Sequence, residues 1–208
     1  MSTISATAVK ELREMSGAGM MDCKKALTEA SGNLEDAIDI LRKTGIAKAR
    51  KKSDRSAKEG LVFPYIHPGS KLGVLLEINC ETDFVANTDD FKDLCKDISM
   101  HIAASAPMSV TREEISSDVL DREKAIYADQ ARQSGKPENI IEKMTEGRLN
   151  KFYQENVLVE QSFVKDPDKT VNDLITETVA KLGENIIISR FSRFQLGEKV
   201  NNSVPTKN

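Results

Sequence analysis

The seven residues from Glu81 to Asn87, Glu-Thr-Asp-Phe-Val-Ala-Asn, place a carboxylate beside an aromatic ring between two predicted elements. A charged group and a hydrophobic group on a short connector held at both ends suit a contact with another protein better than a catalytic centre. In the opposite interpretation, Phe84 packs into the core while Thr82 or Asp83 caps the following helix. The residue pattern alone slightly favours this buried arrangement.

Two amphipathic elements flank the connector. Alternate residues before it are apolar, which predicts a strand with one buried face formed by Leu72, Val74, Leu76, Ile78 and Cys80. After it, apolar residues recur at spacings of three and four, which predicts a helix with a single buried stripe of Phe91, Leu94, Cys95, Ile98 and Ile102. We therefore expect both ends of the connector to be anchored.

Residues that usually perform catalysis are few and poorly spaced for it. Neither His67 nor His101 has a nearby carboxylate pattern that suggests a metal pair or an activated nucleophile. His101 adjoins the apolar stripe, which is typical of a partly buried helix residue, whereas His67 lies on a tight turn where we expect exposure. Because the sequence has no glycine-rich phosphate loop, we expect no direct nucleotide binding. These features predict a binding protein with no enzymatic activity, cofactor or metal site.

Composition narrows the class of protein further. The 208 residues carry a net charge of −3 and are 5% aromatic, which gives no general bias toward nucleic acid or membrane. No window approaches 18 consecutive apolar residues, so we expect no membrane-spanning helix. The helical pattern begins within a few residues of Met1, so we also expect no signal peptide. The cysteines are odd in number and each lies on an apolar stripe, which predicts reduced, buried thiols and a cytoplasmic location: Cys23, Cys80 and Cys95.

The first quarter of the chain predicts a small helical domain. Residues 4–46 contain three short helical patterns, the second ending at Gly32 and the third capped by Asn33. We assign residues 1–53 to this domain, which resembles the ubiquitin-associated fold. A basic run then extends to about residue 59. Because the chain is net acidic, this run suits a solvated helix end and linker better than a phosphate contact.

Residues 60–198 predict an α+β core with a small antiparallel sheet. A hairpin of strands 61–66 and 72–80 comes first, and residues 186–188 predict a buried strand start that pairs with it. Residues 111–133 are highly charged, which indicates an exposed helix, and Pro137 opens another helix with Ile140, Ile141 and Met144 facing inward. Thr170 and Asp173 begin a helix that ends at Gly183. Residues 199–208 predict a disordered tail.

Four segments along the chain form a recognisable set. They are Gly17-Ala18-Gly19-Met20-Met21-Asp22-Cys23-Lys24-Lys25-Ala26-Leu27, Thr82-Asp83-Phe84-Val85, the stretch from Ser134-Gly135-Lys136-Pro137 to Phe152, and Gln161-Ser162-Phe163-Val164-Lys165-Asp166-Pro167 with Lys169-Thr170-Val171. In this order they closely resemble the translation elongation factor Ts family. Only about the last ten residues fall outside the resemblance. It implies a guanine-nucleotide exchange factor that binds elongation factor Tu.

The resemblance also implies roles for particular residues. Phe84 is the wedge that disturbs the Mg²⁺ and phosphate site of elongation factor Tu, with Asp83 its polar neighbour, framed by Thr82 and Val85. The segment with Met20 and Met21 docks on the G domain of that partner. Periodicity alone assigns Met20 to the core, in phase with Cys23, and Met21 to the polar face of its helix.

Two other functions fit parts of the chain. The first bundle could belong to an adaptor of the ubiquitin-associated type that binds a partner helix without exchange activity. Nucleic-acid binding through the basic run is weaker, because the run lacks interleaved aromatic residues.

The chain resembles the short form of the family, without the second half-repeat of the core that longer members carry. A sheet of about three strands leaves unpaired edges, which are normally covered or paired. We therefore expect a homodimer, unless residues 111–160 fold back over the edge.

Overall fold

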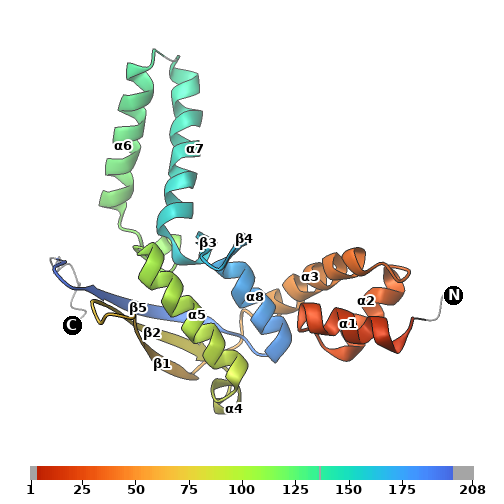
Figure 1. The fold of residues 1–208 in the computed structure, drawn as a ribbon. Helices are drawn as coiled ribbons and strands as arrows, with labels where there is room; N and C mark the ends of the chain where they lie inside the picture. The colour runs from red at the N-terminus through yellow and green to blue at the C-terminus, as the bar shows by residue number, and fades with distance from the viewer. Residues whose placement is uncertain (1–3, 136, 199–208) are drawn as a thin grey trace.

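A computed structural model describes residues 4–135 and 137–198, and within them the chain combines α-helices with a small antiparallel sheet (Figure 1). The predicted α+β class is confirmed. The N-terminal helices are α1 (Ala6–Ser16), α2 (Met20–Glu29) and α3 (Leu34–Arg50). The remaining elements are β1 (Glu59–Ile66), β2 (Leu72–Cys80), α4 (Asp83–Ala86), α5 (Asp89–Ser105), η1 (Arg112–Glu114), α6 (Ser117–Gln133), α7 (Glu138–Asn156), η2 (Leu158–Glu160), β3 (Ser162–Phe163), β4 (Asp166–Thr170), α8 (Val171–Leu182) and β5 (Ile187–Gln195).

Helices α1–α3 pack around a cluster of their own. Its buried members are Val9, Leu12, Cys23, Ala26, Leu27 and Ala37. Asn33 caps α3 as predicted, by accepting hydrogen bonds from the backbone N–H groups of Glu35 and Asp36. The helix runs beyond the predicted end at residue 46 to Arg50, so part of the basic run is helical. Gly45 lies where α3 approaches α8 closely, because a Cβ there would lie 3.4 Å from the Cβ of Ala180 on α8.

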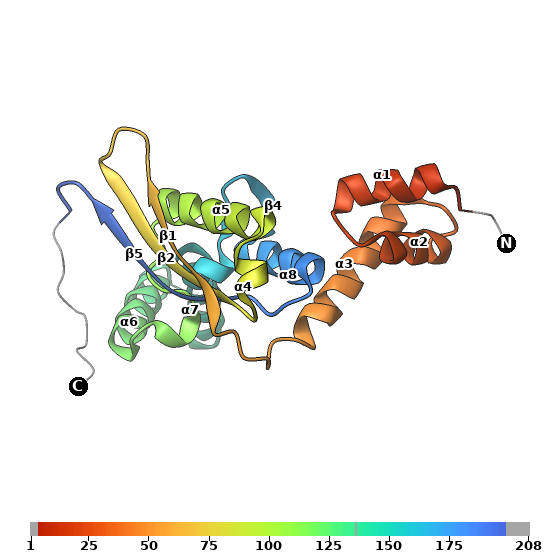
Figure 2. The ribbon, with the colours of Figure 1, turned by 90° about the horizontal axis from the view of Figure 1, so that it is seen from below.

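The sheet has the strand order β1-β2-β5, and every pair is antiparallel. The predicted hairpin is confirmed, and its turn is closed by hydrogen bonds from the His67 N–H to the Leu72 carbonyl and from the Ser70 N–H to the His67 carbonyl. Helices α5 and α8 lie on one face of the sheet, and α8 also contacts α3 of the N-terminal bundle (Figures 1 and 2). Helix α8 therefore lies between the sheet and the bundle.

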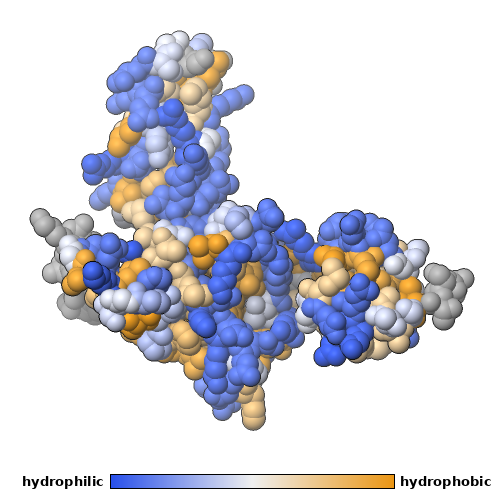
Figure 3. Space-filling model, in the orientation of Figure 1, coloured by the Kyte–Doolittle hydropathy of each residue, from blue (hydrophilic) through white to orange (hydrophobic). Residues whose placement is uncertain are grey.

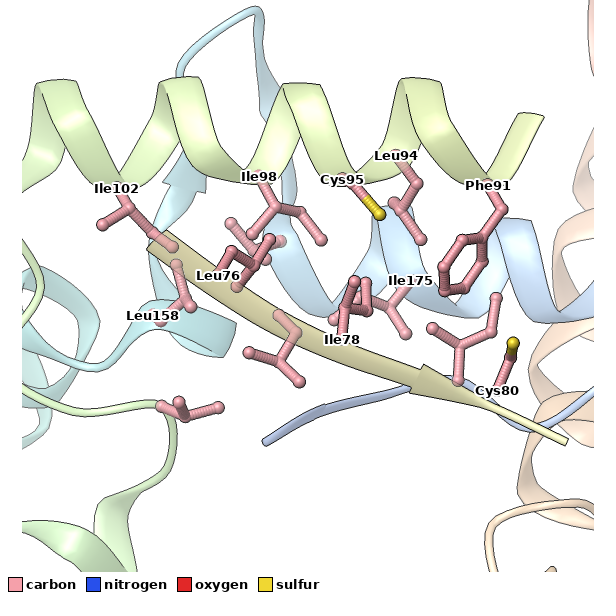
Figure 4. Close-up of a cluster of buried hydrophobic side chains, with 14 of the residues drawn as sticks. Leu76, Ile78, Cys80, Phe91, Leu94, Cys95, Ile98, Ile102, Leu158 and Ile175 are labelled. Carbon is pink, nitrogen blue, oxygen red and sulfur yellow. The ribbon is translucent and has the colours of Figure 1, made fainter. Parts of the chain in front are cut away.

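The main core fills the space between β2, α5 and α8 (Figure 4). The predicted strand face and helix stripe meet there, and all of their members are buried except Leu72, which is half-buried. Of the three isoleucines predicted to be buried at the start of β5, Ile186 and Ile188 are buried, but Ile187 is exposed. Successive side chains of a strand point to opposite faces, so a run of three cannot be buried against one layer.

Helices α6 and α7 form a long hairpin that projects away from the sheet (Figure 1). Its base is closed by a small cluster of Ile115, Phe152 and Val157. Pro137 precedes α7 as its N-cap, Ile141 is buried and Met144 is half-buried. The prediction that Ile140 faces inward is wrong, because a two-helix arm buries only a narrow stripe and Ile140 lies beside it in solvent.

Among the described residues, no helix has both the length and the apolar character needed to cross a membrane. The predicted disordered tail, residues 199–208, lies outside the part of the chain that the structure describes.

Candidate protein-docking site

The connector between β2 and α5 folds into the single helical turn α4. Thr82 is its N-cap, and the Thr82 hydroxyl accepts a hydrogen bond from the Val85 N–H at 3.4 Å. Thr88 then caps α5, and its hydroxyl donates to the Val85 carbonyl at 2.7 Å. Two consecutive caps thus fix a turn that would be too short to persist as an isolated helix.

This turn directs its side chains to two different environments. Ala86 is 3% exposed and Val85 packs against the core, whereas Phe84 is 83% exposed. The surface over α4 ends in an apolar projection (Figure 3). The interpretation that Phe84 plugs the core is therefore wrong. Thr82 does act as an N-cap, but of the single turn α4, whereas Thr88 caps the following helix α5. Asp83 is also exposed, so the outward side of the turn presents a carboxylate beside an aromatic ring.

The segment from Gly17 to Met21 forms the α1–α2 junction. Gly17 ends α1 with a φ of 65°, a left-handed conformation that favours glycine, and its N–H bonds to the Arg13 carbonyl. Met21 is 75% exposed, in agreement with its predicted polar face. Met20 is 46% exposed, so its assignment to the core by periodicity is wrong. It is the first residue of α2, where the helix extends past the apolar cluster that buries Cys23.

A lysine on α8 connects the two segments. The Lys181 Nζ lies 2.6 Å from the Asp90 carboxylate, in the first turn of α5. A Cβ at Gly17 would lie 3.7 Å from the Cδ of the same lysine. The α1–α2 junction and the start of α5 therefore both lie close to the side chain of Lys181.

The residue after Gly183 binds the base of α4 and was not anticipated from the sequence. One oxygen of Glu184 accepts hydrogen bonds from the backbone N–H groups of Glu81 and Thr82, each at 3.0 Å. The other oxygen accepts from the Thr82 hydroxyl at 2.6 Å. The only local signal for this residue is its place after a helix stop, which does not indicate a contact 102 residues away.

His101 and the three cysteines are buried inside the fold. His101 is fully buried, more so than predicted; its Nδ1 accepts from the Val164 N–H and its Nε2 bonds to the Gln161 side chain. Burial lowers the pKa of His101 below the ordinary 6.5. Burial likewise raises the pKa of the Cys80 thiol to about 11 and that of Cys95 to about 12, so both stay protonated at neutral pH. All three cysteines are free and buried, as predicted.

His67 lies in solvent on the hairpin turn, where its Nδ1 is 3.0 Å from the Tyr65 hydroxyl. Within residues 4–135 and 137–198, no cluster of three or more His, Cys, Asp or Glu side chains has an arrangement that could hold a metal ion.

Comparison with known proteins identifies close relatives over nearly the whole chain. A family model described as "Elongation factor TS" matches residues 2–198. Three proteins named elongation factor Ts are similar throughout. The protein of Thermoanaerobacter pseudethanolicus is 58% identical over 96% of this chain and 98% of its own length. The corresponding values are 59%, 94% and 91% for Geobacter sulfurreducens, and 60%, 94% and 99% for Fervidobacterium nodosum.

Proposed function

Because this chain belongs to the elongation factor Ts family, we propose that it acts as a guanine-nucleotide exchange factor for elongation factor Tu. The observation that carries this proposal is the exposure of Phe84 on a turn whose neighbouring residues are anchored. Isolated exposed hydrophobic residues are common on protein surfaces. Phe84 differs from these, because its ring is 83% exposed and the turn that carries it is fixed by two helix caps. Such a fixed, exposed ring suits a preorganised contact with a partner.

The task of such a factor follows from the chemistry of G proteins. A G protein holds GDP through phosphate contacts and Mg²⁺, so release requires that grip to be loosened and the empty state to be stabilised. The wedge is Phe84, which enters between side chains of elongation factor Tu. The Asp83 carboxylate competes there for the hydrogen bonds that support the Mg²⁺ site. Thr82 and Val85 hold the wedge at its two ends.

A second contact keeps the partner in place while the first acts. We assign it to Met20 and Met21, whose flexible and polarizable side chains adapt well to a hydrophobic groove. Both are exposed at the start of α2. Two linked contacts bind more tightly than either alone, because the second forms within the complex. In this proposal residues 1–53, a bundle of the ubiquitin-associated type, and residues 60–198 act as separate units joined by the basic linker.

No bond is made or broken by the factor itself, which acts without a cofactor and binds no nucleotide, nucleic acid or membrane. Its effect comes from binding the empty form of elongation factor Tu better than the GDP form. Such coupling is reciprocal, so GDP must also weaken the complex. This reciprocity distinguishes an exchange factor from an adaptor.

We also propose that the chain is a homodimer through the outer face of its sheet. Alternate residues of the strands leave apolar side chains in solvent there, including Val62, Ile66, Leu75 and Phe194. Ile66, Gly73 and Phe194 are cross-strand partners in one row, and the Ile66 side chain lies over Gly73. The α6–α7 arm points away from this sheet (Figure 1). It therefore does not cover the sheet within one chain, which was the alternative to a dimer.

The function is tested with elongation factor Tu loaded with a fluorescent GDP analogue. The full chain is expected to accelerate release of the analogue severalfold or more at micromolar concentration. It is also expected to form a complex with nucleotide-free elongation factor Tu on size exclusion that dissociates when GDP is added. A stable complex that is indifferent to GDP, without accelerated release, would instead identify an adaptor.

A further inference from the structure

The single turn α4, with Asp83 and Phe84 on its outward side, is called the tip below. The turn that follows α8 binds both the base of this tip and the linker from the N-terminal bundle. We propose that Glu184 is a positioning residue that fixes the direction in which Asp83 and Phe84 are presented, with Asn185 holding the linker at the same point. This inference rests on the proposed exchange function, because it assigns a residue that acts through the proposed wedge.

Glu184 uses both carboxylate oxygens on the residues that lead into α4. Its three hydrogen bonds satisfy the N–H groups of Glu81 and Thr82 and the Thr82 hydroxyl. These N–H groups lie where the last residues of β2 leave the sheet, next to the buried Cys80. If Glu184 were removed, these N–H groups would lose their hydrogen-bond partner, and the chain between β2 and α4 would be held less firmly in its present direction.

The cap on α4 depends on the same carboxylate. The Thr82 hydroxyl has a single hydrogen, which it donates to Glu184 at 2.6 Å. That orientation turns its lone pairs toward the Val85 N–H, which donates to it. A free hydroxyl would rotate, and the one-turn helix has too few internal hydrogen bonds to keep its direction without the cap.

Asn185 completes the arrangement and is itself buried. Its backbone N–H donates to the Glu81 carboxylate at 2.7 Å, so Glu81 and the turn bind each other reciprocally. Its side-chain amide donates to the carbonyls of Arg55 at 2.8 Å and Ser53 at 3.2 Å, both in the linker. The Arg55 guanidinium lies 3.5 Å from the Glu81 carboxylate.

This geometry matters for a factor that grips its partner at two places. The tip and the linker that leads to Met20 and Met21 are attached to two consecutive residues, Glu184 and Asn185. Together with the packing of α3 on α8, this attachment sets the spacing between the two contacts. Displacement of a positioned group by about 1 Å can lower a rate by about a hundredfold, so loss of Glu184 should reduce exchange without removing any contact residue.

The test compares Glu184→Ala and Glu184→Gln with Glu177→Ala. Glu177 lies on α8 and pairs with Lys169 at 2.9 Å, so it controls for loss of a paired carboxylate. Release of a fluorescent GDP analogue at saturating factor should slow about tenfold or more in Glu184→Ala. Glu184→Gln should recover part of the rate, because its amide oxygen accepts both N–H groups, whereas its NH₂ cannot accept the hydrogen of the Thr82 hydroxyl. Glu177→Ala should match the unmodified protein.

Two readouts separate positioning from general destabilisation. Amide hydrogen exchange over residues 81–88 should be faster in Glu184→Ala and unchanged in Glu177→Ala. In an Asp83→Ala, Phe84→Ala background, Glu184→Ala should cost no further exchange activity, because both groups that it positions are missing. Equal losses in both backgrounds, or a Glu184→Ala protein that matches Glu177→Ala in release and in hydrogen exchange, would overturn the proposal.

If Glu184→Ala does not fold, Glu184→Asp serves in its place, because it keeps the charge but is one methylene too short for all three bonds. The hydrogen-exchange comparison tests the positioning of the tip even if the unmodified protein fails to accelerate GDP release. Failure of the proposed function is thereby distinguished from failure of this inference.

Discussion

Phe84 and Ala86 lie on opposite sides of one helical turn, with exposures of 83% and 3%. Two positions along a helix correspond to a rotation of about 200°, so burying one residue directs the other outward. Ala86 packs into the main core, and the turn is thereby held while the aromatic ring of Phe84 remains in solvent. The exposure of Phe84 thus follows from the burial of Ala86 on the other side of the turn.

The buried His101 predicts an acid-sensitive stability. Its pKa is lowered by burial, so the unfolded chain takes up a proton below about pH 6.5 while the folded chain resists it. Protonation of Nδ1 would also remove the acceptor of the Val164 N–H. The free energy of unfolding should therefore fall as pH drops below 6.5, by up to about 1.4 kcal/mol per pH unit from this residue.

Urea denaturation at pH 7.5 and 5.5 measures this loss. The His101→Gln variant, which keeps a hydrogen-bonding side chain without the titration, should lose less stability between the two pH values. An equal loss in both proteins would show that His101 does not cause the acid sensitivity.

Removal of residues 1–53 should leave a folded core with weak affinity for elongation factor Tu. The core cluster lies almost entirely in residues after 60, and the bundle has a separate cluster, so the truncation divides no hydrophobic core. Loss of one of two linked contacts should weaken binding about a hundredfold or more. Fluorescence titration measures the affinity, and circular dichroism checks the fold.

A Met20→Ala, Met21→Ala double variant of the full chain provides the matched comparison. It keeps the bundle but trims the proposed contact, so part of the same loss should appear. Full activity of the truncated protein would eliminate the second contact.

Light scattering tests the proposed homodimer. The free protein should have a mass near twice 23.0 kDa at high concentration, and Leu75→Glu should reduce it to the monomer. Leu75 lies at the centre of the outer sheet face, where a buried charge in the interface would be costly. Val164→Glu is the control, because Val164 and Leu75 are equally exposed, at 47%, but Val164 lies in the β3–β4 hairpin and not on the sheet face. A mass that stays near 23.0 kDa throughout a dilution series would contradict the dimer.

Regular periodicity predicted the parts of the fold that depend on one local pattern. The face of β2, the stripe of α5 and the Thr170–Asp173 capping box were predicted because strand and helix geometry imposes fixed spacings. Met20, Ile140 and Ile187 were predicted incorrectly because their burial depends on what lies opposite them. A helix start, a thin arm and a one-sided sheet each leave apolar residues in solvent.

The candidate site was predictable only in part. Thr82 was identified as a possible cap, but the direction of Phe84 depends on which side of the turn meets the core. The contact of Glu184 with Thr82 spans 102 residues and arises only when β5 returns beside β2. No local sequence pattern encodes such a contact, because it is a product of tertiary packing.

The role of Phe84 as the wedge is best tested by the rate of GDP release from elongation factor Tu in the presence of Phe84→Ala, measured by stopped-flow fluorescence. Because the ring is in solvent, its removal should change the free energy of unfolding by less than about 0.5 kcal/mol. Release should slow about tenfold or more, as expected when a central aromatic contact is lost. Met108→Ala, which trims another exposed apolar side chain, should retain the rate of the unmodified protein. If GDP leaves elongation factor Tu as fast with folded Phe84→Ala as with the unmodified protein, Phe84 is not the wedge.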